Sequence, residues 1–425
     1  MRLTKLAGAA CLTAVAVACS ALVAAPATAF PLEPTPISDA FYAPVPDLEA
    51  TNPGDIISSR MMPPPPGFFD SDVWQLRFRS TNSAGEPIAA VNTVLVPRDK
   101  APNGPLLSYQ HIINALGLEC APSQALWSQD PNLVIREAPA LNVALQRGWT
   151  IAIADHLGPN SAYGAAKLGG QIVLDSIRAT QRFEQLQLQE SPVALAGYSG
   201  GGMATAWAAA LHNDYAPELN IVGSATGGAP MNLERMARDL GFSPHPAFGL
   251  AFAAAMGLER EYPTRIPISQ QLNPLGQQMA TELQDACTND ILAVGAGKSA
   301  MQVAGSLSLI ESPEMIAAVN ENSVELYSGV PKAPYFEWHS PTDALIPVSS
   351  IDNTIARYCA AGVPVTRLIV PSNDHLTAAL LGLPQALDWI DARFPRDRDV
   401  ELAERGSYGP AEAQRAEIWV PKGEA

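Results

Sequence analysis

Short apolar runs alternate with longer segments of helical spacing along most of the chain. Near-continuous apolar runs are typical of strands that a parallel sheet buries on both faces. We predict strands at 73–80, 87–97, 104–110, 149–155, 192–199, 220–228, 333–340 and 366–371. Helical length and spacing are found at 134–147, 162–187, 200–213 and 376–393. This alternation predicts an α/β fold, and the polar turn "TNSAGE" between the first two strands predicts a β-hairpin.

One region lacks this alternation of strand and helix patterns. Residues 231–330 contain no clear strand pattern and carry apolar residues at helical spacing, as in "HPAFGLAFAAAMGLERE". We therefore predict a helical cap inserted between two parts of the core, 71–230 and 331–396. The proline-rich segment 30–70 predicts an extended arm with little structure of its own. The charged segment 397–425 is expected to be a loosely attached tail.

The first 29 residues have the composition of a secretory signal peptide. A short basic start precedes an apolar stretch of mostly small residues from Leu6 to Ala25, and "ATA" at 27–29 is a cleavage pattern. Cleavage after Ala29 is therefore expected, which predicts a secreted protein. Cys19 leaves a lipoprotein as the alternative, although the leucine usual three residues before it is absent. No later stretch is apolar enough to predict a transmembrane segment.

Acidic residues outnumber basic ones. The net charge of −16 becomes −18 when Arg2 and Lys5 leave with the signal peptide. A surface this acidic disfavours nucleic acid and anionic membranes as partners. Cys120, Cys287 and Cys359 remain, and an oxidising compartment favours one disulfide and one free thiol. Composition does not indicate which two of them pair.

A glycine-flanked serine lies at the end of the predicted strand 192–199. "GYSGG" at 197–201 matches G-x-S-x-G and is followed by an alanine-rich helix. In this context the pattern is typical of a nucleophile elbow, which presents the serine side chain at the edge of the sheet. The N–H of Gly200 would lie at a helix N-terminus, where negative charge is favoured. The alternative is a glycine-rich turn with a bystander serine, since the motif alone is weak evidence.

A nucleophilic serine needs a base, and the base needs an orienting carboxylate. In α/β-hydrolases the acid and then the histidine follow the serine on loops after later strands. Asp343 follows "APYFEWHSPT" and His375 follows "TRLIVPSND", so we predict that they serve Ser199 as acid and base. Asp374 is adjacent to the histidine, and a neighbouring side chain is not usually free to orient its ring. His339 is expected to be structural.

Several separated segments resemble one family. "ECAPS", "DHLGPNSAYGAAKLGGQIVLDSIRA", "HSPTDALIP" and "SNDHLTAALLGLPQALDWIDARF" are together similar to secretory lipases of the Candida antarctica lipase A type. The similarity extends from about residue 40 to residue 394. The resemblance implies an α/β-hydrolase core with a helical cap and lid between nucleophile and acid. It also implies a triad on Ser199, Asp343 and His375.

The resemblance carries further implications. It implies a disulfide between Cys120 and Cys287, which leaves Cys359 free, and we expect that thiol to be buried. It implies hydrolysis of carboxylic esters, typically acylglycerols, a reaction that needs no metal or organic cofactor.

The residues themselves give no metal site at His156. A role for His156 as a metal ligand is disfavoured, because no second ligand lies at a suitable spacing.

One loop departs from the family pattern. In the family, a glutamine is followed four residues later by an aspartate whose N–H helps to form the oxyanion hole. "YQHIINALGLECAPS" places Asn114 at that position. Because either residue supplies an N–H, Asn114 and Gly200 are the predicted oxyanion donors. The loss of the side-chain charge is expected to alter pH dependence or acyl preference.

These observations predict a secreted triacylglycerol lipase that acts through an acyl-enzyme. Its expected partners are a lipid or ester substrate and a lipid–water interface, at which residues 231–308 would move. An acyltransferase of cell-envelope lipids and a short-chain esterase would use the same triad and stay open as alternatives. A peptidase is disfavoured because nothing in the cap predicts an amine pocket. A non-catalytic secreted binding protein is disfavoured by the complete triad.

Overall fold

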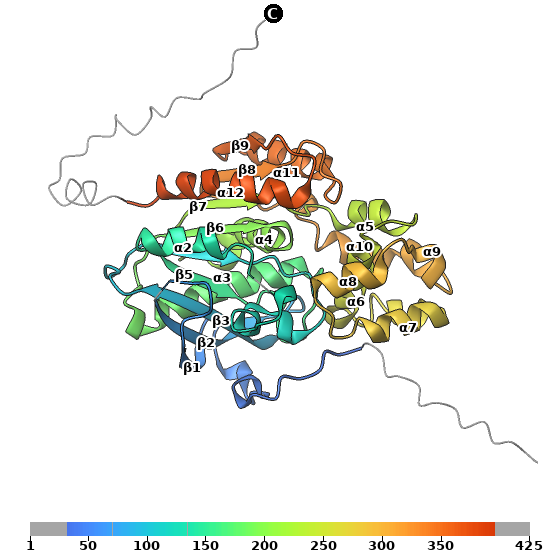
Figure 1. Ribbon diagram of the computed structural model, residues 1–425, viewed down its shortest axis with the longest axis horizontal. Helices are drawn as coiled ribbons and strands as arrows, with labels where there is room; N and C mark the ends of the chain where they lie inside the picture. The colour runs from blue at the N-terminus through green and yellow to red at the C-terminus, as the bar shows by residue number, and fades with distance from the viewer. Residues whose placement is uncertain (1–31, 70, 134, 396–425) are drawn as a thin grey trace, which may run out of the picture.

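The protein is built around one nine-stranded mixed sheet (Figure 1). The computed structural model describes residues 32–395 except 70 and 134. The strands are β1 (Ile56–Met62), β2 (Ser71–Thr81), β3 (Pro87–Pro97), β4 (Leu106–Gln110), β5 (Thr150–Ala154), β6 (Val193–Tyr198), β7 (Ile221–Gly227), β8 (Tyr335–His339) and β9 (Val365–Ile369). Their order is β1-β2-β3-β5-β4-β6-β7-β8-β9. Strands β1 to β3 pair antiparallel with their neighbours, whereas β4 to β9 are mutually parallel.

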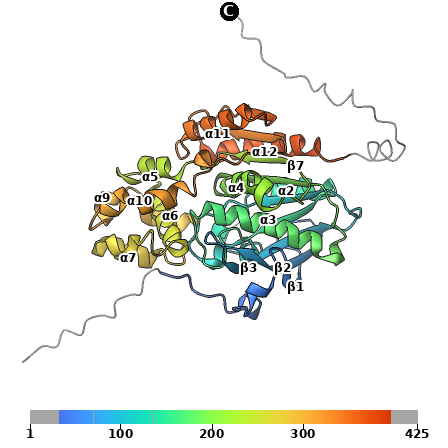
Figure 2. The same cartoon turned by 180° about the vertical axis from the view of Figure 1, so that it is seen from behind.

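Helices cover both faces of the sheet (Figures 1 and 2). On one face lie α3 (Ala166–Arg182), α4 (Ser199–Tyr215) and α11 (Val348–Ala360). On the other lie α1 (Pro122–Ala125), α2 (Ala138–Gln146) and α12 (His375–Asp391). Every residue of β4, β5 and β6 is buried, because these parallel strands are covered from both sides. The predicted α/β fold class is confirmed.

The chain between β7 and β8 forms the predicted helical insertion, which lies at one side of the molecule (Figure 1). Its helices are α5 (Leu233–Gly241), α6 (Phe248–Glu261), α7 (Pro274–Glu282), α8 (Thr288–Gly295), α9 (Ala300–Val303) and α10 (Pro313–Asn320). Within residues 231–330, all of them described, β pairing is limited to two isolated bridges. The cap has its own apolar core, which Ile113 and Leu116 of the loop after β4 join. Among the described residues, no helix has the length and apolar character needed to cross a membrane.

Two segments differ from the sequence-based predictions. The arm predicted at 30–70 contains a regular strand, because β1 pairs along the edge of β2, where Arg60 donates to Gln75 at 2.8 Å. The sequence "IISSRMM" lacks regular alternation, so pairing with the neighbouring strand decides this element. Helix α11 was not predicted, although its buried face follows helical spacing. The predicted signal peptide and the tail at 397–425 lie outside the described residues.

A buried carboxylate ties β5 to the elements around it. Asp155 accepts hydrogen bonds from the N–H (2.9 Å) and Oγ (2.5 Å) of Ser123, at the start of α1. The Tyr42 hydroxyl of the N-terminal arm donates to the same Oγ at 2.9 Å. Burial raises the pKa of Asp155 to about 7, although the hydrogen bonds from Ser123 act in the opposite direction. The folded protein therefore keeps this carboxyl protonated at pH values where the unfolded chain ionises it.

Asp155 is expected to make the protein less stable as the pH rises from 5 to 8. Between the ordinary Asp pKa of about 3.9 and the folded value, the unfolded chain releases a proton that the native state retains. The free energy of unfolding should therefore fall by about 2–3 kcal/mol over this range, and this contribution should level off above the folded pKa. Denaturant unfolding at pH 5 and pH 8 measures the change, and Asp155→Asn should remove it. The exposed Asp130→Asn is the control. An equal pH dependence in wild type and Asp155→Asn would contradict the assignment.

Candidate active site

The predicted elbow is a strained turn between β6 and α4. Ser199 is the first residue of α4 and has a φ of +53°, a left-handed conformation that residues with a side chain rarely adopt. A Cβ at Gly197 would lie 2.6 Å from the carbonyl oxygen of Gly201, and one at Gly201 would collide with the carbonyl oxygen of Gln110. The glycines thus allow β6, α4 and β4 to approach closely at the carboxyl edge of the sheet.

His375 is the buried first residue of α12. Asp374 caps this helix, since its carboxylate accepts the Thr377 N–H at 2.7 Å. The Tyr198 hydroxyl donates to the carbonyl oxygen of His375 at 2.6 Å, and the two rings lie 5.0 Å apart. The residue before Ser199 therefore holds His375 in place. No sequence signal indicated this contact, because Tyr198 occupies the unspecified position of G-x-S-x-G.

Asp343, in the loop after β8, contacts His375 directly. Its Oδ2 is 2.6 Å from Nδ1 of the histidine, and its Oδ1 accepts the N–H groups of Leu345 (2.9 Å) and Ile346 (3.0 Å). Burial raises the pKa of Asp343, but the hydrogen bond and charge of His375 and the two backbone N–H groups outweigh burial and lower the pKa overall. The ionised carboxylate thus accepts from Nδ1 and orients the imidazole ring.

The second ring nitrogen of the histidine is left unengaged. Nε2 of His375 is buried and has no hydrogen-bond partner among the described residues. In the neutral form of the imidazole, the contact with an ionised Asp343, which only accepts, places the ring proton on Nδ1 and leaves Nε2 as the acceptor. The ring packs against Tyr198, the residue before Ser199. An acceptor nitrogen placed against a strained serine turn is suited to removing a proton from an alcohol.

The structure brings the predicted oxyanion donors, Asn114 and Gly200, together. A Cβ at Gly200 would lie 2.5 Å from Oδ1 of Asn114 and 3.0 Å from the carbonyl oxygen of Ile113, so the loop after β4 abuts the serine turn. Gly200 is the second residue of a 17-residue helix, and the first N–H groups of a helix have no partner within it. Both the free N–H groups and the helix dipole favour negative charge at this point.

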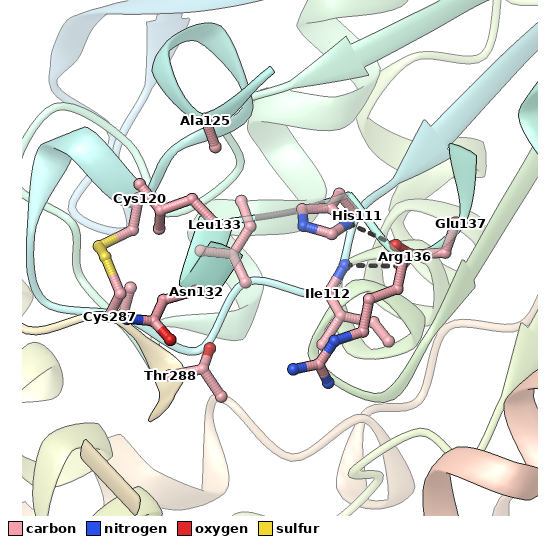
Figure 3. Close-up of a pocket in the computed structure, with 12 residues that line it drawn as sticks. His111, Ile112, Cys120, Ala125, Asn132, Leu133, Arg136, Glu137, Cys287 and Thr288 are labelled. Carbon is pink, nitrogen blue, oxygen red and sulfur yellow. Dashed lines mark hydrogen bonds and ion pairs between the residues drawn. A yellow bond between two sulfur atoms is a disulfide. The ribbon is translucent and has the colours of Figure 1, made fainter. Parts of the chain in front are cut away.

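A buried contact between a histidine and a carboxylate supports the same loop from a neighbouring cavity (Figure 3). Nδ1 of His111 is 2.8 Å from Oε2 of Glu137, whose Oε1 accepts the Ile112 N–H at 3.2 Å. Burial raises the pKa of Glu137, but His111 and backbone N–H groups outweigh burial and lower it overall. The disulfide implied by the resemblance, Cys120–Cys287, is present and lines this cavity. The His111–Glu137 pair was not predicted, because no motif relates the two positions.

Two further histidines, His339 and His156, are buried and do not belong to the predicted triad. His339 is buried, with its Nδ1 2.8 Å from Oε1 of Glu337 in the same strand, which is consistent with the structural role expected for it. His156 is also buried, and burial lowers its pKa to about 3, so this imidazole is neutral. In the described part of the chain, no group of three or more His, Cys, Asp or Glu side chains is arranged to hold a metal ion.

The surroundings of Cys359 correct one expectation. The thiol is free, as expected, but it is exposed and not buried. Helix α11 buries Ile351, Ile355 and Tyr358 on one face, and Cys359 lies on the outward face beside them. Its position on the helix, and not the chemistry of the thiol, decides its exposure.

An apolar cavity of about 90 Å³ lies between the serine turn and the cap. Gly200 and Met203 of α4 line it at the turn. Residues of α5, α6 and α10 line most of the rest, among them Leu233, Met236, Leu240, Leu250, Ala254, Ala255, Leu258, Met315 and Val319. The volume accommodates several groups the size of a water molecule, and its apolar walls favour hydrocarbon over water.

The chain is similar to known lipases over most of its length. The sequence profile of secretory lipases matches residues 133–401. Lipase A of Moesziomyces aphidis is 32% identical, with 89% of this chain and 85% of that protein aligned. A Mycobacterium tuberculosis protein named as a probable inactive lipase is 33% identical over 84% of this chain and 82% of that protein. The X-ray structure of Candida antarctica lipase A in its closed state superposes with a TM-score of 0.79, at 30% identity, covering 84% of this chain and 87% of that chain.

The mostly parallel sheet, the helical insertion and the match to a solved lipase define the class of the protein as an α/β-hydrolase with carboxylic ester hydrolase activity. Within that class, the chain belongs to the secretory lipase family. The resemblance recognised in the four sequence segments is thereby confirmed.

Proposed function

We propose that the protein is a secreted triacylglycerol lipase that uses Ser199, His375 and Asp343 to form an acyl-enzyme. One observation carries this proposal. Asp343 holds Nδ1 of His375 at 2.6 Å, while the buried Nε2 is unengaged and the ring packs against the residue before the strained Ser199. This arrangement supplies the base, its orienting acid and a strained turn that carries the proposed nucleophile.

In the proposed reaction, Nε2 of His375 accepts the Ser199 proton as Oγ attacks the ester carbonyl. Asp343 stabilises the imidazolium that forms. The N–H groups of Gly200 and Asn114 bind the developing oxyanion, and each donor contributes about 3–4 kcal/mol in comparable sites. His375 returns the proton to the leaving alcohol. Water, deprotonated by the same nitrogen, then releases the acid and restores the serine. Transfer of the acyl group to another alcohol would use the same residues.

The apolar cavity supports a fatty acyl substrate over a short one. It begins at Gly200, where the carbonyl oxygen of a bound ester would lie, and continues between α5, α6 and α10. An acyl chain attached to that carbonyl has an apolar path into the cap. Burial of each methylene stabilises the complex by about 0.8 kcal/mol. This acyl path supports a lipase over a short-chain esterase with the same three residues.

Narrowing the cavity is expected to abolish the preference for long chains. Ala255→Phe on α6 should lower kcat/KM for p-nitrophenyl esters of twelve to eighteen carbons by about tenfold or more and leave the butyrate ester nearly unchanged. Ala293→Phe, at an exposed position of α8 in the same cap, is the matched control. A wild type active only on acetate and butyrate, or an equal loss on all chain lengths in Ala255→Phe, would contradict the proposed acyl path.

We also place this activity outside the cell. The family is secretory, and the first 29 residues have the composition of a signal peptide with cleavage after Ala29. One relative is named as a probable inactive lipase, so the alternative is a secreted binding protein on the same scaffold. Substitution of Ser199 separates these two functions.

A further inference from the structure

Arg260 is a buried cation near the end of α6, and its hydrogen bonds to the described residues all go to backbone carbonyl groups. Only 6% of the residue is exposed. Its guanidinium donates to the carbonyl oxygens of Leu32 (2.8 Å), Leu116 (2.6 Å), Asn160 (3.0 Å), Ser161 (3.2 Å) and Gln284 (2.8 Å). Burial lowers the pKa of Arg260 to about 10, and the charges of Glu33 and Asp285 oppose this. A buried charge persists only where its donors are satisfied, so these segments are held together around one side chain.

The shortest of these bonds reaches the loop that carries Asn114. Leu116 accepts from Arg260 through its carbonyl oxygen, and its N–H donates to the carbonyl oxygen of Ala286 at 2.9 Å. Two residues earlier, the Thr288 hydroxyl donates to the carbonyl oxygen of Asn114 at 3.1 Å. Both ends of segment 114–116 are therefore bonded to the cap. We call Arg260 and Thr288 the cap clamp, since they are the two side chains that make these contacts.

The clamped segment is the one that abuts the serine turn. Oδ1 of Asn114 lies only 2.5 Å from the point that a Cβ on Gly200 would occupy, so a shift of this loop changes the gap between the two predicted oxyanion donors. An oxyanion hole requires donors within hydrogen-bond distance of the developing charge. A misplacement of about 1 Å at a reacting centre costs about 10²-fold in rate. A displacement of this loop is therefore expected to slow the chemical step.

We infer that the cap clamp positions the oxyanion loop, so that the cap supplies transition-state stabilisation as well as a covering for the site. The inference rests on the proposed function of Ser199, Gly200 and Asn114. Arg260 and Thr288 are positioning residues: they act through the backbone of Leu116 and Asn114 and do not touch the substrate. Their loss should weaken oxyanion binding while ground-state binding of the ester persists.

The test compares Arg260→Lys and Thr288→Val with wild type on p-nitrophenyl butyrate, with active sites counted by phosphonate titration. Lysine presents one ammonium group and cannot serve four separate segments. We expect kcat per titrated site to fall by about 10²-fold in Arg260→Lys, with KM nearly unchanged. In Thr288→Val the loss of one hydrogen bond should lower kcat about fivefold. The inhibition constant of a trifluoromethyl ketone, whose serine adduct bears an oxyanion, should rise by the same factors. Arg265→Lys, which affects a surface pair with Glu321, is the matched control.

A merely structural role would give a different result. Fewer titratable sites or a lower unfolding midpoint, with unchanged kcat per site and unchanged inhibition by the ketone in both variants, would overturn the inference. If Arg260→Lys does not fold, Thr288→Val decides by the same two measurements. A wild type that the phosphonate does not titrate at Ser199 would instead overturn the proposed function, and the inference with it.

Discussion

Replacement of Ser199 by alanine is expected to lower kcat for ester hydrolysis by about 10⁶-fold, which leaves only the residual effect of the oxyanion donors and substrate binding. The physical reason is that, under the proposed mechanism, water would have to attack the ester directly, without the acyl-enzyme that the serine oxygen would form. Alanine at this position loses the hydroxyl and keeps the backbone turn. Steady-state hydrolysis of p-nitrophenyl esters across chain lengths measures the effect.

Ser224→Ala is the matched control for this substitution. Ser224 is a buried serine of β7, the strand next to β6, and its hydroxyl has no hydrogen-bond partner among the described residues. We expect full activity in Ser224→Ala, and phosphonate labelling at Ser199 in wild type and in this control only. Ser199→Ala with undiminished hydrolysis would place the nucleophile elsewhere. Absence of hydrolysis in both wild type and variant would favour a binding protein.

Asp343→Asn is expected to lower kcat by about 10⁴-fold with little change in folding. The structure gives the reason. Oδ1 of Asp343 already accepts the N–H groups of Leu345 and Ile346, so an asparagine would keep its oxygen there and turn its amide group toward His375. Two donors cannot face each other, so Nδ1 would become the acceptor and the ring proton would move to Nε2. That tautomer cannot accept the proton of Ser199.

The neighbouring Asp374→Asn tests whether this effect belongs to Asp343 alone. Asp374 is exposed and accepts the Thr377 N–H as the cap of α12, and asparagine is an equally good capping residue. Activity and the unfolding midpoint should therefore stay near the wild-type values. If Asp374→Asn lost activity while Asp343→Asn kept it, the carboxylate would have to be reassigned to the residue adjacent to the histidine.

Much of the core could be predicted because its signals are local. The apolar run predicted as a strand at 104–110 is β4 (Leu106–Gln110), and the helix predicted at 376–393 is α12 (His375–Asp391). Burial on both faces favours apolar or small residues at most positions of a short strand, and this leaves a visible pattern. Strand β1 was missed because "IISSRMM" carries no such pattern and depends on pairing with β2.

The candidate site also has a part that the sequence predicted and a part that it did not. Ser199, Asp343 and His375 each follow a strand at the carboxyl edge of the sheet, so order along the chain was enough to select them. The contacts that hold the surrounding segments in place were not predictable. Tyr198 bonds the histidine backbone across 177 positions of sequence, and Arg260 reaches Leu116 across 144. Such contacts have no fixed spacing, because they depend on how separate segments fold back onto one another.

The sequence by itself determined the α/β class, the place of the helical insertion and the three residues proposed for catalysis, because periodicity and chain order express them directly. Only the tertiary structure decided what surrounds those residues. It paired His111 with Glu137 beside the loop after β4, left Cys359 exposed on α11, and opened an apolar cavity from Gly200 into the cap. Each of these depends on which faces of distant segments meet, and the free energy of those contacts is gained only when the whole chain is folded.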